Sequence, residues 1–88
     1  MITLRRKPIE VQAVLWDGTS DSTMEIFNFV GDAEHFDYDP AKGNAEVYDY
    51  LHDTWIHVHI GDYIIRGTRG EHYPVSAKTL GDLYDVID

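Results

Sequence analysis

The chain has 88 residues, a length that supports one hydrophobic core, so we expect a single domain over residues 1–88. It contains no cysteine, and no apolar run approaches the roughly 20 residues needed to span a bilayer, so we expect no disulfide, no thiolate site and no membrane segment. The formal charge of −9 argues against direct nucleic-acid binding, because neutralising phosphates requires a cationic surface.

The first third of the chain predicts a strand followed by a helix. Apolar residues recur at every second position from Ile9 to Leu15, which is the period of a strand, and Asp17–Gly18 interrupts the pattern. Residues 22–25 match a capping box, in which a serine hydroxyl and a glutamate carboxylate satisfy the first N–H groups of a helix. Gly31 stands where a left-handed residue ends such a helix, so we expect about two turns.

The middle of the chain predicts a series of short strands. Alternating residues favour strands over residues 45–51 and 55–60, and residues 35–38 could form another short strand. Turn residues lead into two further runs, at residues 63–66 and 71–73, which we also expect to be strands. Turn-forming residues separate these segments at residues 40–44, 52–54, 61–62 and 67–70. Connections this short favour antiparallel neighbours, so we expect a meander of three or four strands.

The last residues predict one more helical turn and a closing strand. Ser76 can cap a turn that runs to Leu80 and ends at Gly81, and residues 83–87 alternate as a strand does. The fold class we predict is therefore α+β: a small, strongly curved antiparallel sheet, barrel-like, with one or two short helices. A sheet in so short a chain leaves open edges, and we expect a homo-oligomer to cover them.

Residues 61–74, read as Gly-Asp-Tyr-Ile-Ile-Arg-Gly-Thr-Arg-Gly-Glu-His-Tyr-Pro, resemble a signature of small uncharacterised phage and prophage proteins. The basic element Arg6–Lys7–Pro8, the strand ending at Trp16 and an aromatic segment near Tyr84 match the same family in the same order. The chain departs from the family at His72, where phenylalanine is usual, and at Ile60, where proline is usual. The resemblance implies a phage origin and the cytoplasm of a host bacterium, and it argues against a freestanding metabolic enzyme.

Acidic residues are concentrated in one segment. Residues 17–53 hold ten acids against Lys42 alone. One interpretation is a solvated face that aids solubility, and another is an acidic surface that imitates DNA. A third is a protein-binding surface in which aromatic side chains stand among the acids. The candidate residues for this partner surface are Trp16, Tyr48, Tyr50, Trp55, Asp37, Asp39, Glu46 and Asp49.

The Gly67–Gly70 turn carries a second candidate site. Glycine would let the backbone turn sharply and present two guanidinium groups to a phosphate or carboxylate. The residues that would bind a small anionic ligand are Arg66, Arg69, Glu71, His72 and Tyr73. The simpler alternative is a hairpin turn in which Arg66 pairs with an acid.

His57 and His59 lie on the same face of a predicted strand, close enough to share a metal ion, with His52 or His72 as a third ligand. The alternative is a pair of solvated histidines. No spacing singles out a pair of carboxylates, and no serine or threonine has the context of a nucleophile, so we expect a protein that is not an enzyme and needs no cofactor.

Three hypotheses follow from the sequence. The first is a phage-encoded, non-enzymatic binding protein that modulates a host factor or defence system through an acidic, aromatic-bearing surface. The second is an oligomeric receptor, or sponge, that captures an anionic nucleotide or other small ligand at Arg66 and Arg69. The third is a metal-dependent enzyme that uses His57 and His59.

Overall fold

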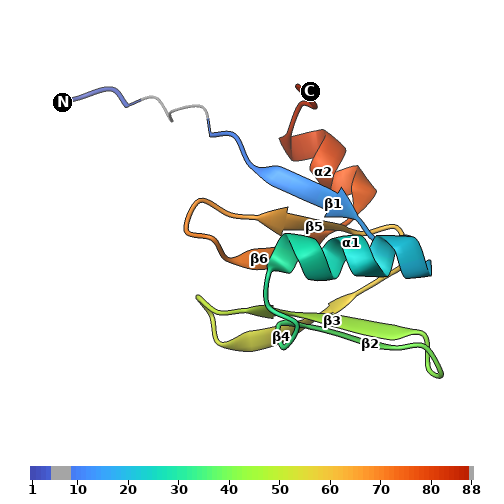
Figure 1. The fold of residues 1–88 in the computed structure, drawn as a ribbon. Coiled ribbons are helices and arrows are strands. Elements are labelled where there is room, and N and C mark those ends of the chain that lie inside the picture. Colours follow the sequence, from blue (N-terminus) through green and yellow to red (C-terminus); the bar gives the residue numbers. More distant parts are fainter. Residues whose placement is uncertain (5–8, 88) are drawn as a thin grey trace.

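The computed structural model describes residues 1–4 and 9–87 and shows an α+β fold, as the sequence predicts (Figure 1). The basic element Arg6–Lys7–Pro8 lies outside the described residues. The elements in chain order are β1 (Gln12–Leu15), α1 (Ser20–Val30), β2 (Phe36–Asp39), β3 (Asn44–Asp49), β4 (Thr54–Val58), β5 (Tyr63–Arg66), β6 (His72–Val75) and α2 (Ala77–Leu83).

The strands form two antiparallel three-stranded sheets, with strand orders β1-β5-β6 and β2-β3-β4. The expected meander is present in the second sheet, but β5 leaves it and pairs with β1 from the start of the chain. Two hydrogen bonds fix this change of partner: Trp16 N–H donates to the Asp62 carbonyl, and Gly61 N–H donates to the Trp16 carbonyl, each at 2.9 Å. No barrel closes among the described strands, and the strong curvature that we expected is not confirmed.

The elements are layered, and the layering places one sheet face toward solvent. Figure 1 shows α2 above the sheet of β1, β5 and β6, and the sheet of β2, β3 and β4 at the bottom. The two sheets meet where β6 contacts β3 and β4, and α1 packs against β1 of one sheet and β2 of the other. No helix in the described part of the chain has the length and apolar character needed to cross a membrane.

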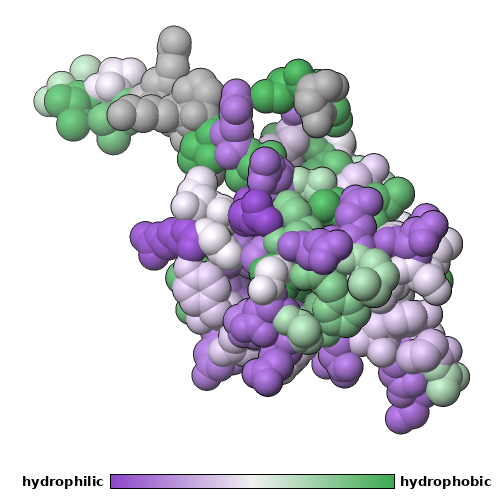
Figure 2. Space-filling model, in the orientation of Figure 1, coloured by the Kyte–Doolittle hydropathy of each residue, from purple (hydrophilic) through white to green (hydrophobic). Residues whose placement is uncertain are grey.

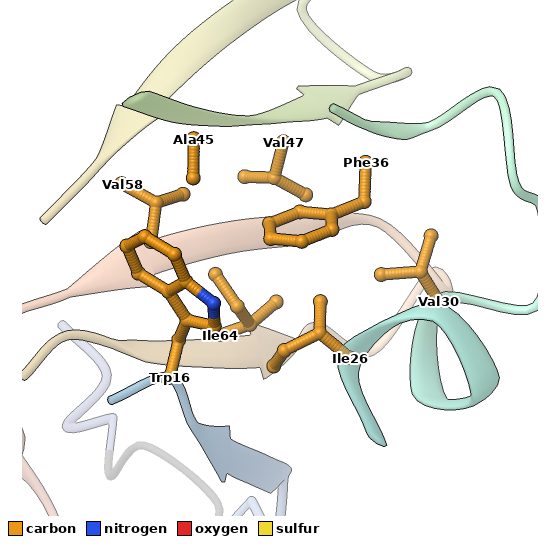
Figure 3. Close-up of a cluster of buried hydrophobic side chains, with 8 residues drawn as sticks. All are labelled: Trp16, Ile26, Val30, Phe36, Ala45, Val47, Val58 and Ile64. Carbon is orange, nitrogen blue, oxygen red and sulfur yellow. The ribbon is translucent and has the colours of Figure 1, made fainter. Parts of the chain in front are cut away.

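The core lies between the two sheets and α1. Figure 3 shows its side chains pointing toward one another from both sheets and from the helix; they are Trp16, Ile26, Val30, Phe36, Ala45, Val47, Val58 and Ile64. Trp16 is 1% exposed and donates its indole N–H to Thr23 Oγ1 at 3.0 Å. Its ring meets Phe36 and Tyr38 edge-on, with centroids 6.3 and 5.4 Å apart. The largest buried ring of the protein is therefore also fully hydrogen-bonded.

The N-cap of helix α1 lies three residues before the predicted capping serine, Ser22. Thr19 is the N-cap, and its side chain accepts the Ser22 N–H at 3.2 Å. Asp17 holds the N-cap residue in place by accepting hydrogen bonds from the Thr19 N–H and hydroxyl at 2.9 and 2.6 Å. Hydrogen bonds from Ser22 and Thr19 lower the pKa of Asp17 to about 2. The predicted end is confirmed, because Gly31 has φ 78° and donates its N–H to the Phe27 carbonyl.

The C-terminal helix is longer than predicted, and the closing strand is wrong. Ser76 caps α2 as expected, with its hydroxyl accepting the Thr79 N–H at 3.1 Å. The helix then continues through Gly81 to Leu83, and the Tyr84 N–H closes it by donating to the Leu80 carbonyl. Residues 84–87 form no strand. Alternation over five residues does not distinguish a strand from an extended tail that pairs with nothing.

Candidate functional site

The outward face of the β2-β3-β4 sheet carries the candidate site. Because side chains alternate across a strand, burial of Phe36, Val47 and Val58 turns their neighbours outward. We call this surface the outer face and define it by five residues, Asp37, Glu46, Tyr48, Trp55 and His57. Figure 2 shows hydrophilic residues predominating along the lower part of the molecule, where this sheet lies.

Aromatic rings form a row across the outer face. Tyr48 pairs with Trp55 in register, and their ring centroids are 5.5 Å apart. His35 extends the row on the other side of Tyr48, with centroids 5.1 Å apart. The Tyr48 hydroxyl donates to the Asp53 carboxylate, which raises the pKa of Tyr48. This contact holds the phenol ring in place beside Trp55, whose side chain remains exposed.

Acidic side chains lie next to the aromatic row. Asp37 and Glu46 are directly opposite each other in the β2–β3 register. Within the described part of the chain, neither carboxylate has a hydrogen-bond or ion-pair partner. Like charges in this arrangement destabilise a sheet. A hollow of about 320 Å³ separates these acids from Trp55, and its lining is Ala33, Glu34, Phe36, Asp37, Glu46 and Trp55.

Two residues of the predicted partner surface are buried, so their placement there was wrong. Trp16 belongs to the core because the β1 strand ends beneath α1, where Thr23 accepts its N–H. Asp49 is 4% exposed, and its carboxylate accepts the Leu51 N–H at 3.0 Å and contacts His52 Nδ1 at 2.6 Å. Both side chains satisfy polar groups inside the fold and are unavailable to a partner.

Two further residues of that prediction lie at the edges of the sheet. Tyr50 is exposed, and its hydroxyl donates to the Arg69 carbonyl in the neighbouring hairpin. Asp39 organises the β2–β3 turn by accepting the Ala41 N–H at 3.0 Å. The outer face thus brings together Asp37, Glu46, Tyr48 and Trp55 from the predicted set.

Arg66, the first residue of the predicted anion site, is engaged inside the fold. Its guanidinium donates to Gln12 Oε1 at 2.7 Å and to the Phe29 carbonyl at 2.5 Å. The same group lies 4.2 Å from the centroid of the Phe29 ring. A cation here satisfies a free carbonyl in the last turn of α1, where the helix dipole favours positive charge. Among the described residues, Arg66 does not form the ion pair with an acid that we considered.

The rest of the predicted anion site is divided between two faces of the β5–β6 hairpin. His72 points toward Phe29, with ring centroids 5.6 Å apart. Glu71 and Tyr73 line a hollow of about 450 Å³ on the opposite face, beside α2. Burial and a hydrogen bond with Tyr84 raise the pKa of Tyr73 to about 12. These three residues cannot act together on one small ligand, because β6 separates them.

The Gly67–Gly70 segment is a hairpin turn. Gly70 has φ 80° and donates its N–H to the Gly67 carbonyl at 3.1 Å. The Glu71 carboxylate accepts the Arg69 N–H at 3.0 Å and fills the space that a Cβ at Gly67 would need. The Arg69 side chain is exposed. The glycines therefore shape the turn and make room for Glu71.

His72 is a buried histidine whose Nε2 has no hydrogen-bond partner among the described residues. Burial, with Arg66 and His35 as smaller positive influences, lowers the pKa of His72. The unfolded chain therefore binds a proton near pH 6.5 that the folded chain rejects. The free energy of unfolding is therefore unaffected by the titration of His72 well above that pH, where both states are neutral, and it decreases as the pH falls.

Replacing His72 with phenylalanine is expected to stabilise the protein. The ring keeps its edge-on contact with Phe29, and removing the unpartnered nitrogen should raise the free energy of unfolding at pH 7 by about 1 kcal/mol. The advantage should grow as the pH falls from 7 to 5, because only the wild-type chain pays the protonation penalty. Urea denaturation of both proteins at each pH measures the difference. A constant difference across this range would contradict the buried, neutral state of His72.

His57 and His59 lie side by side at the edge of the outer face, with ring centroids 4.4 Å apart. His59 also contacts Asp62 at 3.5 Å. The two histidines considered as a third ligand are held elsewhere, His52 by Asp49 and His72 by burial. Across residues 1–4 and 9–87, no three histidine, aspartate or glutamate side chains come together as a metal site.

Sequence reasoning missed two residues of the candidate site, Glu34 and His35. His35 shares the outward parity of Asp37 in a segment that was predicted as a strand, so alternation alone could have placed it on this face. Glu34 precedes the strand, and no periodic signal assigns it to the hollow. Comparisons of this chain with protein-family models, with curated proteins and with solved structures found no match.

Proposed function

We propose that this chain is a stoichiometric binding protein that occupies a basic surface of a partner protein with its outer face. The observation that carries the proposal is the row of rings at Tyr48 and Trp55 beside the opposed carboxylates of Asp37 and Glu46. Exposed aromatics supply contact area at an interface, and unpaired carboxylates supply charge complementarity.

The proposal extends to the biological setting. The resemblance of residues 61–74 to phage and prophage proteins supports a phage origin, with a host factor or defence protein in the bacterial cytoplasm as the partner. The binding interpretation accounts better for the arginines than the nucleotide-receptor interpretation does, because Arg66 is committed to Gln12 and Phe29. The binding interpretation also needs no catalytic group.

A capture experiment with two matched charge reversals tests this function. The tagged chain is incubated with bacterial lysate as wild type, as Glu46→Lys on the outer face, and as Glu25→Lys on the exposed side of α1. Wild type and Glu25→Lys should retain the same protein, and Glu46→Lys should lose it. Raising the salt from 0.05 to 0.3 M should weaken binding of the purified partner by about tenfold.

Two outcomes would contradict the proposal. Equal retention by all three proteins would show that the outer face does not contact the partner. Equal loss from both variants would show that binding depends on overall charge and not on this face. Turnover of a substrate by the purified chain, abolished by His57→Ala together with His59→Ala, would instead favour the metal-dependent enzyme.

A further inference from the structure

We infer that the partner inserts an arginine side chain into the hollow between Trp55, Asp37 and Glu46. This inference rests on the proposed function and deepens it, because it names the chemical group that the outer face recognises. The occupant is the guanidinium of an arginine in an exposed basic segment of a protein.

The acidic residues that line the hollow favour a positively charged occupant. Asp37 and Glu46 stand opposite each other, and Glu34 adds a third carboxylate to the lining. His57 is the cross-strand neighbour of Glu46 on the other side, and no lysine or arginine of the described residues forms an ion pair with either carboxylate. The segment that builds this sheet contributes only Lys42 as a compensating charge. A cation placed between the strands would relieve the repulsion between the opposed carboxylates. Binding therefore removes an unfavourable interaction that the free protein carries.

The shape and lining of the hollow favour guanidinium over ammonium. Trp55 is 44% exposed and lines the hollow, and indole is the aromatic side chain that binds cations best. A planar guanidinium can stack on the indole ring while its N–H groups reach two carboxylates, whereas an ammonium is more strongly hydrated and acts as a point charge. A volume of about 320 Å³ is at the small end of ligand pockets, which suits one inserted side chain.

The protein already holds one guanidinium in this way. Arg66 lies over the Phe29 ring at 4.2 Å and donates to two oxygens, one from Gln12 and one from the backbone of Phe29. The hollow on the outer face reproduces this combination of an aromatic ring and oxygen acceptors, with carboxylates in place of neutral oxygens and no arginine of its own in the lining.

The two tryptophans make a direct test with an internal control. Trp16 is buried and bonded to Thr23, whereas Trp55 lines the hollow, so their indole N–H signals in a ¹⁵N NMR spectrum report on two separate places. The full chain is titrated with a blocked peptide of alternating arginine and glycine, and with matched lysine and citrulline peptides. The arginine peptide should shift the Trp55 signal and leave the Trp16 signal unchanged. The lysine peptide should bind at least about threefold more weakly, and the uncharged citrulline peptide should not bind.

Variants separate a local site from overall charge. Glu46→Gln should weaken binding of the arginine peptide by about five- to tenfold, and Glu25→Gln, which removes the same charge from α1, should change it by less than about twofold. Glu46→Gln should also raise the melting temperature by about 1–4 °C, because it ends the repulsion with Asp37. Weaker binding by a more stable protein cannot result from misfolding.

Several results would overturn the inference. They are equal binding of the arginine and lysine peptides, equal weakening by the two variants, or no shift of the Trp55 signal at saturating peptide. A Trp55 shift that depends only on protein concentration would identify a second copy of this chain as the occupant. If any of these occurs while Glu46→Lys still abolishes capture of a partner protein, the proposed function stands and the arginine inference alone fails.

Discussion

Replacing Trp16 with alanine is expected to lower the free energy of unfolding by about 3–5 kcal/mol. The ring is 1% exposed, packs between both sheets and α1 and donates to Thr23, so its removal leaves a cavity and takes away a buried hydrogen bond. A domain of this length has a total stability of about 4–13 kcal/mol, so the substitution should remove a substantial share of it. Urea denaturation followed by circular dichroism measures the change.

Trp55→Ala is the matched control for this prediction. It deletes the same side chain from an exposed position on the outer face, and its cost should be below about 1 kcal/mol. Equal destabilisation by the two substitutions would contradict the assignment of Trp16 to the core and Trp55 to the surface. Among samples that fold, Trp55→Ala should weaken partner binding more than Trp16→Ala does, because Trp55 is on the outer face and Trp16 is not.

Replacing Arg66 with alanine is expected to cost about 1.5–3 kcal/mol of stability. The substitution removes the donor to the Phe29 carbonyl, the bond to Gln12 and the stacking on the Phe29 ring. Arg66→Lys should recover about half of the loss, because an ammonium can reach one acceptor and cannot present the planar fork. The melting temperatures of the three proteins, measured by thermal unfolding, should decrease from wild type to Arg66→Lys to Arg66→Ala.

Arg69→Ala distinguishes this structural role from ligand binding. The Arg69 side chain is exposed, and among the described residues Arg69 forms hydrogen bonds through its backbone N–H and carbonyl, so removal of the side chain should change stability by less than about 0.5 kcal/mol. An anion receptor predicts instead that the two variants lose nucleotide-induced stabilisation equally while their own stabilities remain unchanged. That result would restore the nucleotide-receptor hypothesis.

The sequence by itself determined the local structure well. Turn residues located the β5 strand at residues 63–66, since a run bounded by Gly61 and Gly67 leaves little choice of ends. Gly31 and Ser76 marked helix boundaries, because a left-handed φ and a capping hydroxyl are properties of single residues and their nearest neighbours. The acidic character of the β2-β3-β4 sheet was also visible, because charge is counted without knowing the fold.

Only the tertiary structure decided which strands pair and which faces are buried. Alternation shows that a strand has two faces but does not say which of them meets the core, so Trp16 and Asp49 were predicted at the surface and lie inside. Arg66 found its acceptor on Gln12, 54 residues earlier in the chain, and no local pattern encodes a contact at that separation. The outer face likewise depends on the tertiary structure, because β5 pairs with β1 in the other sheet and the core covers only one side of the β2-β3-β4 sheet.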